Sequence, residues 1–190
     1  TMKKMIKFPS IEQFRTVVAT VLRQFNYIGL DENGDAIYDT TKTKPTLTFK
    51  GTVKLHGTNA AVSYNTNGGL WAQSRENIIT PEKDNAGFAF FVETNKESFT
   101  NIMWNLVTKN GLNPEETTLT VYGEWAGGSI QKGVGISNIP KTFFVFGVKV
   151  TPHTENEEEL KLKPAYWIDS THIRDEDNRI YNIDHFRTYT

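Results

Sequence analysis

The spacing of apolar residues predicts helical structure in two parts of the chain. Residues 10–25, SIEQFRTVVATVLRQF, place apolar side chains three and four positions apart, and Ser10 stands where a helix N-cap is expected. Residues 86–109 show a second helical stripe, and Asn110-Gly111 behind it is a typical helix end. We therefore expect one helix near the N-terminus and another across residues 86–109.

Shorter alternating runs predict strands in the first half of the chain. Residues 27–39, YIGLDENGDAIYD, are typical of a hairpin around an Asn-Gly turn. Residues 46–64 alternate as one or two strands interrupted near Gly57, and residues 70–78 form the strand that returns from the NTNGG turn. These runs predict neighbouring antiparallel strands.

The second half of the chain is expected to be mostly β-structure. Residues 117–128, TTLTVYGEWAGG, predict a strand that runs into a glycine-rich loop, and residues 142–150, TFFVFGVKV, predict a strand buried on both faces. A polar, acidic stretch at 151–164 and short strand-like pieces follow. The elements lack a βαβ rhythm, so we expect one α+β domain over residues 1–190, with largely antiparallel sheets and flanking helices.

Composition narrows the classes of function. The 190 residues hold 21 basic and 22 acidic side chains, so contact with nucleic acid would need a local basic patch. Cysteine is absent, which excludes disulfides and cysteine-based zinc sites. No long apolar stretch follows the two early lysines, and we expect neither a signal peptide nor a membrane anchor. The expected location is the cytosol.

Lys54 is the first candidate for chemistry, in the segment FKGTVKLHGTNAAVSYN at residues 49–65. The expected strand would desolvate the base of this side chain between two apolar neighbours and place His56 on the same face. Lysine becomes a covalent nucleophile when burial or nearby cations favour its neutral amine. Gly57 would allow close approach of a ligand. The alternative is a solvated strand lysine before a turn.

Three later residues have types that suit nucleotide binding. Arg75, in WAQSRENI, could clamp a phosphate or ribose, and Glu124, in VYGEWAGG, could accept from a ribose hydroxyl or hold a metal ion. Phe146, in FFVFGVKV, could stack on a base. The alternatives are a surface arginine, a strand-edge glutamate and a plain core aromatic.

Together these segments resemble a known family. KLHG resembles the KxDG or KxHG nucleophile motif of the covalent nucleotidyltransferases, the superfamily of ATP-dependent ligases and mRNA capping enzymes. With Thr58-Asn59 behind it, the motif is similar to that of ATP-dependent RNA ligases of the phage type-2 and editing-ligase branch. The resemblance covers roughly residues 46–150, because three further motifs follow in the family's order: SR at 74–75, YGEWAG at 122–127 and FFVFG at 143–147.

The resemblance implies an α+β adenylyltransferase domain that joins RNA. Lys54 would form a lysyl-AMP adduct with ATP and pass the adenylate to an RNA 5′-phosphate. The implied cofactors are ATP and Mg²⁺, the latter near Glu124, and the implied partners are RNA ends or a nicked RNA duplex, without a protein partner or membrane. The implied nucleotide-site residues are Thr52, Val53, Lys54, His56, Gly57, Asn59, Arg75, Glu124 and Phe146.

The chain departs from the family pattern in two respects. Gly147 stands where the family usually has an acidic residue. No EG dipeptide, the mark of motif IV, follows Glu124, and KLK at 161–163 has the spacing of motif V but comes too early. We therefore interpret KLK as coincidence and the chain as a truncated ligase core that adenylates itself poorly.

Two alternatives remain open at this stage. One is a DNA ligase or a capping guanylyltransferase. The other is a binding module for nucleotides or RNA that keeps the fold without the chemistry. His153, His172 and His185 show no metal-ligand spacing and receive no role.

Overall fold

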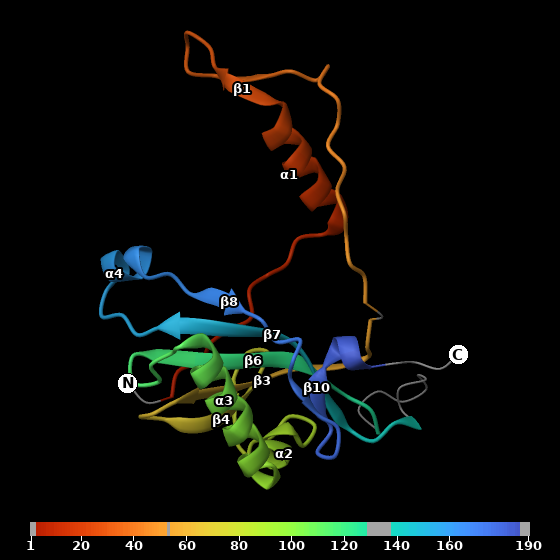
Figure 1. The fold of residues 1–190 in the computed structure, drawn as a ribbon, viewed down its shortest axis with the longest axis vertical. Coiled ribbons are helices and arrows are strands. Elements are labelled where there is room, and N and C mark those ends of the chain that lie inside the picture. The colour runs from red at the N-terminus through yellow and green to blue at the C-terminus, as the bar shows by residue number, and fades with distance from the viewer. Residues whose placement is uncertain (1–2, 53, 129–137, 187–190) are drawn as a thin grey trace. The chain divides into compact units, whose positions relative to one another are not determined.

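The computed structural model describes residues 3–52, 54–128 and 138–186. The chain forms two compact units, Thr1–Phe8 with Thr52–Thr190, and Pro9–Gly51 (Figure 1). We name the first the sheet unit and the second the insert. No helix in the described ranges is long and apolar enough to span a bilayer.

The insert consists of one helix and one hairpin. Helix α1 spans Phe14–Asn26, and strands β1, Tyr27–Leu30, and β2, Ala36–Tyr38, pair antiparallel. The predicted helix and hairpin are confirmed. The predicted cap is wrong, because α1 begins only at Phe14, after Gln13, and Ser10 lies outside the helix. No residue of α1 is buried.

The sheet unit is built on one mixed sheet that is almost entirely antiparallel. Its strand order is β5-β4-β3-β6-β7-β10-β9, with β8 also paired to β7, and only β10 runs parallel to its neighbour β7 among the described pairings. This confirms the α+β class. The strands are β3 Gly57–Asn65, β4 Gly69–Ser74, β5 Ile78–Ile79, β6 Thr117–Ala126, β7 Thr142–Pro152, β8 Tyr166–Ile168, β9 Arg174–Asp175 and β10 Ile180–Asn182.

Helices α2, Phe88–Thr94, and α3, Lys96–Asn110, cover one face of this sheet (Figure 1). The predicted helical stripe is thus confirmed as two helices, and Gly111, with φ of 62°, ends the second. We name this side the core face. Its fully buried side chains include Val62, Phe88, Phe99, Met103, Leu106, Leu119, Val121, Phe143 and Val148.

The opposite face of the sheet is crossed by residues 3–8, which we name the strap. Ile6 of the strap is buried with Ala61 and Tyr122, and Phe8 packs against this group. The strap's backbone is held by the buried Gln73, whose side chain bonds both to the amide and to the carbonyl of Ile6. We name this side the strap face.

The predicted strand over residues 46–64 is only partly present. Strand β3 begins at Gly57, and no strand occurs in the described residues between 46 and 56. The pairing explains this limit, because β6 ends at Ala126 opposite Gly57 and β4 ends at Ser74 opposite Ala60. Alternation alone does not form a strand where no neighbouring strand can pair with it.

Strand β7 contains a bulge at Phe146. Tyr122 of β6 pairs with Gly147 and Gly123 pairs with Val145, which leaves Phe146 as the extra residue. The other edge of β7 also changes partner here, from β10 at residues 143–145 to β8 at residues 148–150. Residues 142–145, 148 and 150 are buried as predicted, whereas Gly147 and Lys149 are partly exposed and Phe146 is 37% exposed.

The polar stretch after β7 contains an unpredicted short helix, α4, Glu157–Leu162, capped by the Asn156 side chain. A single 3₁₀ turn, Ile183–His185, follows β10. The acidic first turn of α4 complements the positive end of the helix dipole, a signal that the apolar pattern of this stretch did not carry.

Candidate functional site

The KLHG segment and Glu124 meet where β3 begins and β6 ends. The Gly57 amide donates a 3.1 Å hydrogen bond to Glu124 Oε1, and Asn59 pairs directly with Glu124 across the two strands. Directly paired residues of antiparallel strands point to the same face, so Asn59 and Glu124 share the strap face with Tyr122. Segments far apart in sequence therefore contribute to one surface.

The electrostatics of Glu124 include Lys54. Burial raises the pKa of Glu124 above its ordinary 4.5, while the Gly57 amide and the positive charge of Lys54 act in the opposite direction. The charge of Lys54 therefore acts on the carboxylate that the KLHG backbone holds. A half-buried carboxylate that lies within the influence of a cation suits a polar, anionic ligand with hydroxyl groups.

The surroundings of Lys54 differ from the prediction. Lys54 and His56 are both exposed and precede β3, so the expected desolvation within a strand is wrong, and alternation does not align the two side chains. Packing within the protein, and not only the approach of a ligand, requires glycine at position 57, because a Cβ there would collide with the Trp125 carbonyl oxygen and with Ala126. The glycine therefore permits close packing of β3 on β6.

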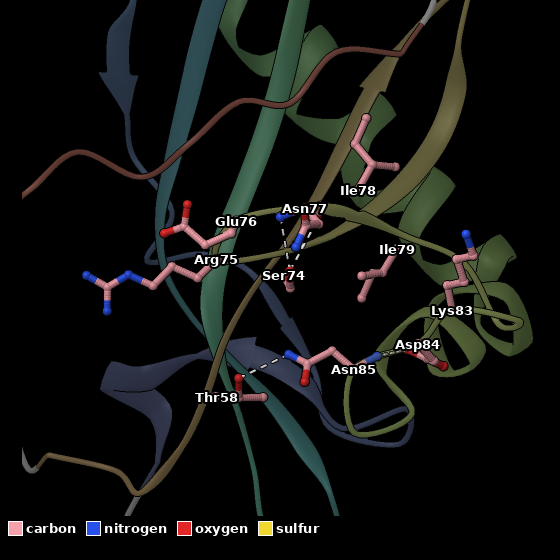
Figure 2. A pocket seen from close by; sticks show the side chains of 10 residues that line it. All are labelled: Thr58, Ser74, Arg75, Glu76, Asn77, Ile78, Ile79, Lys83, Asp84 and Asn85. Atoms are coloured by element: carbon pink, nitrogen blue, oxygen red, sulfur yellow. Dashed lines mark hydrogen bonds between the residues drawn. The ribbon is translucent and has the colours of Figure 1, made fainter.

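Arg75 follows the last residue of β4 and is exposed. A pocket of about 600 Å³ lies at this strand end, lined among others by Thr58, Arg75, Lys83 and Asn85. Figure 2 shows the Asn85 side chain turned toward Thr58, to which it donates a 3.1 Å bond, whereas the Arg75 side chain extends away from Lys83. Arg75 thus stands at the rim, one residue beyond the strand that pairs with β3.

Phe146 lies on the strap face, the same face as Glu124. Its ring centroid is 5.2 Å from that of Phe8, which also contacts Tyr122 at 5.1 Å. Because Tyr122 is two positions before Glu124 on β6, the aromatic cluster borders the carboxylate. The structure therefore places a partly exposed ring on the same face of the sheet as Glu124.

The two residues before Lys54 contribute less information. Thr52 is exposed, and Val53 lies outside the described residues. Backbone contacts of these two residues with a base therefore stay a prediction.

The metal prediction depends on Glu124 alone. Among the residues that the structure describes, no three His, Cys, Asp or Glu side chains gather as a metal site. Mg²⁺ is commonly held by one or two carboxylates together with substrate phosphates. Glu124, half-buried beside a cation, fits this minimal arrangement if a bound phosphate supplies the other oxygens.

Sequence reasoning missed the residues that attach the strap to the strap face of the sheet. Gln73 Oε1 accepts bonds from Ile6, Ser63 and Trp71, and Lys7 pairs with Glu76 at 2.7 Å. The alternation of β4 predicts that Trp71 and Gln73 lie on one face, but a glutamine in a strand is normally expected to be exposed to solvent. Only the strap, more than sixty positions away, makes Gln73 a buried residue.

Comparison with known proteins adds one finding. The model of a family described as RNA ligase matches residues 48–177, which include β3 to β9 and every candidate site residue from Thr52 to Phe146. No curated protein matched the chain. The matched range leaves out the strap and most of the insert.

Proposed function

Because this chain belongs to the RNA ligase family, we propose that it joins RNA ends with ATP through an adenylate carried on Lys54. The observation that supports this role is the hydrogen bond from the KLHG backbone to Glu124. The positive charge of Lys54 also acts to lower the pKa of this carboxylate. Lys54, as the proposed nucleophile, and Glu124, as the proposed ribose acceptor, would then act at one place. Phe146, on the same face, supplies a ring for the base.

The first step forms the adduct. The Lys54 amine, after losing a proton to solvent, attacks the α-phosphorus of ATP; the new bond is P–N, and the P–O bond to the leaving pyrophosphate breaks. When bound to the triphosphate, Mg²⁺ would neutralise the charge that develops on the leaving group. Arg75 would contact the nucleotide phosphate and sugar, and Glu124 would accept a hydrogen bond from the ribose.

Two transfers complete the reaction. An oxygen of the RNA 5′-phosphate attacks the phosphorus of the adduct, so that the P–N bond breaks and Lys54 regains a proton. The RNA 3′-hydroxyl, which loses its proton to solvent, then attacks the activated 5′-phosphate; a phosphodiester forms as the P–O bond to AMP breaks, and AMP leaves. His56 and Asn59, beside the nucleophile at the start of β3, would lie near the reacting phosphate and the incoming strand.

The test is covalent labelling with ATP that carries ³²P at the α-phosphate. We expect label on the wild-type chain with Mg²⁺ and none on Lys54→Arg or Lys54→Ala, since neither variant has the amine at that position. Lys109→Arg is the matched control, because Lys109 is an exposed lysine in the last turn of α3 and should leave labelling unchanged. Label that survives both Lys54 changes would refute the assignment.

The base and the acceptor can be tested separately. ATP should stabilise the protein against heat more than GTP does, whereas a larger effect of GTP would favour a capping-type enzyme. Transfer of the adenylate to 5′-phosphorylated RNA should exceed transfer to DNA of the same sequence, in single strands and at nicks. Equal transfer to DNA would favour a DNA ligase.

A further inference from the structure

The strap is hydrogen-bonded to residues of β4 and β6 that lie close in sequence to proposed nucleotide-site residues. The Ile6 amide donates to Gln73 Oε1 at 3.1 Å, and the Ile6 carbonyl accepts from Gln73 Nε2 at 2.9 Å and from the Tyr122 hydroxyl at 2.7 Å. Gln73 precedes Arg75 by two positions, and Tyr122 precedes Glu124 by two. The strap is thus fixed to β4, which ends one residue before Arg75, and to β6, which carries Glu124.

Phe8, at the end of the strap, contacts the site directly. Its ring meets those of Tyr122, Phe146 and Trp167 at centroid distances of 5.1, 5.2 and 5.5 Å, each close to edge-on. In the described part of the chain, Phe8 is the one aromatic residue whose ring contacts the ring of Phe146. Trp167 in turn lies against the backbone of Gly147, where a Cβ would come within 3.0 Å of its ring.

The contact between Phe8 and Phe146 matters because Phe146 lies in a β-bulge. Phe146 is the extra residue of β7 and has no residue directly opposite on β6, so pairing on the sheet does not hold its side chain. The nearly perpendicular contact with the Phe8 ring supplies the missing restraint, and Phe146 still remains 37% exposed. A ring that is already fixed loses little freedom when a base stacks on it.

We propose that Phe8 is a positioning residue of the nucleotide site, which fixes the Phe146 ring so that adenine can stack on it. This inference rests on the proposed function. It extends the site to a segment outside the range matched by the family model. Phe8 acts through Phe146 and does not contact the reacting atoms.

The test is a double-mutant cycle on AMP affinity, measured by titration calorimetry with the whole chain. Phe8→Ala should weaken AMP binding by about two- to tenfold, the range expected for loss of one edge-to-face aromatic pair. Phe146→Ala should weaken binding more. The variant with both changes should bind no worse than Phe146→Ala alone, because a residue that acts through Phe146 has no effect in its absence.

Kinetics and conservative variants separate positioning from general damage to the fold. Phe8→Tyr keeps the ring and should bind AMP like the wild type, whereas Phe8→Leu keeps bulk without the ring and should resemble Phe8→Ala. In labelling with ATP, Phe8→Ala should raise the ATP concentration for half-maximal rate and leave the rate at saturation nearly unchanged. Phe90→Ala, which removes an equally large exposed ring from α2, is the control and should change neither quantity.

The outcomes distinguish the two proposals. A wild-type chain that binds neither AMP nor ATP contradicts the proposed function, whatever Phe8 does. A wild-type chain that binds, together with unchanged affinity in Phe8→Ala and Phe8→Leu, contradicts the positioning role alone. Additive losses in the double variant also contradict it, because they would show that Phe8 acts independently of Phe146.

Discussion

Gly57 and Glu124 lie 67 positions apart in the sequence, and the amide of the first holds the carboxylate of the second at 3.1 Å. This bond fixes the orientation of Glu124 to the backbone of the KLHG segment. The carboxylate therefore cannot turn without breaking a hydrogen bond at the segment that carries Lys54. A change at either residue should affect the other's contribution to nucleotide binding.

Glu124→Gln should raise stability and lower function. The pKa of Glu124 is raised by burial, so its protonated form favours the folded state; this contribution is full below pH 4.5 and is lost as pH rises through the raised value. The neutral amide still accepts from Gly57 but has no charge to desolvate. We expect a higher melting temperature than wild type at pH 8, a difference that disappears near pH 4, and AMP affinity lower by roughly tenfold or more.

Circular dichroism melts at both pH values and AMP titrations check this prediction. Glu32→Gln, in the exposed turn of the insert's hairpin, is the control and should change neither property. A variant that is less stable than wild type at pH 8 would show that the attraction between Glu124 and Lys54 outweighs the cost of burial.

Gly57→Ala should destabilise the sheet unit. The added methyl group would overlap the Trp125 carbonyl oxygen and Ala126, so β3 would move away from β6 and from Glu124. Overpacking of this kind costs about 1–3 kcal/mol of unfolding free energy. Urea denaturation measures the loss, and Gly51→Ala, where a Cβ meets no atom within 4 Å, should be nearly neutral. Equal stability of the two variants would contradict the packing described for Gly57.

Gln73→Leu should be more damaging than a surface change of the same type. The leucine leaves the Ile6 amide and the Trp71 indole N–H without their buried acceptor. Each orphaned group costs about 1–3 kcal/mol of unfolding free energy, so the loss should be roughly 2–6 kcal/mol. The exposed Gln24→Leu on α1 serves as the control in the same denaturation experiment. A loss below 1 kcal/mol would mean that the strap contributes little to stability.

Replacing both lysines of KLK should leave adenylation unchanged. Lys161 and Lys163 lie at the end of α4, both exposed, with Lys163 3.9 Å from Glu159. Helix α4 follows the end of β7 that pairs with the start of β6 at Thr117, whereas Glu124 lies near the other end of β6. Labelling of Lys161→Ala/Lys163→Ala at limiting ATP checks this, and a severalfold drop would show that KLK takes part in charge neutralisation.

Periodicity predicted the elements that pack on the core face. The apolar residues from Phe88 to Leu106 and those around Phe143 are buried against each other in the core. Burial of one face requires apolar residues at regular spacing, and this spacing can be recognised in the sequence. The motif residues were also found, because their types and order resemble a family. The family match supports that identification, whereas the individual roles of Lys54, Arg75 and Glu124 stay predictions.

What the sequence did not reveal depends on partners far away in the chain. In the described residues before Gly57, the strand expected through Lys54 is absent because β4 and β6 end before they can pair with it. Phe8 stands alone between Lys7 and Pro9 without a periodic pattern, and only its contacts with Tyr122 and Phe146 give it significance. The reason for Gly57, too, lies in β6 and not in its neighbours.

At Phe146, strand β7 shifts its register against β6 on one edge and exchanges β10 for β8 on the other, and this has an evolutionary consequence. Residues 143–145 and 148–150 hold their registers with different neighbours, and the bulge between them can absorb a change in chain length. A lineage can therefore change the length of β7 at Phe146, beside the proposed base site, while Phe143, Val145, Val148 and Val150 stay in the core. Sequence changes that alter the proposed preference for a nucleotide or an RNA end can accumulate at Phe146 without refolding the sheet.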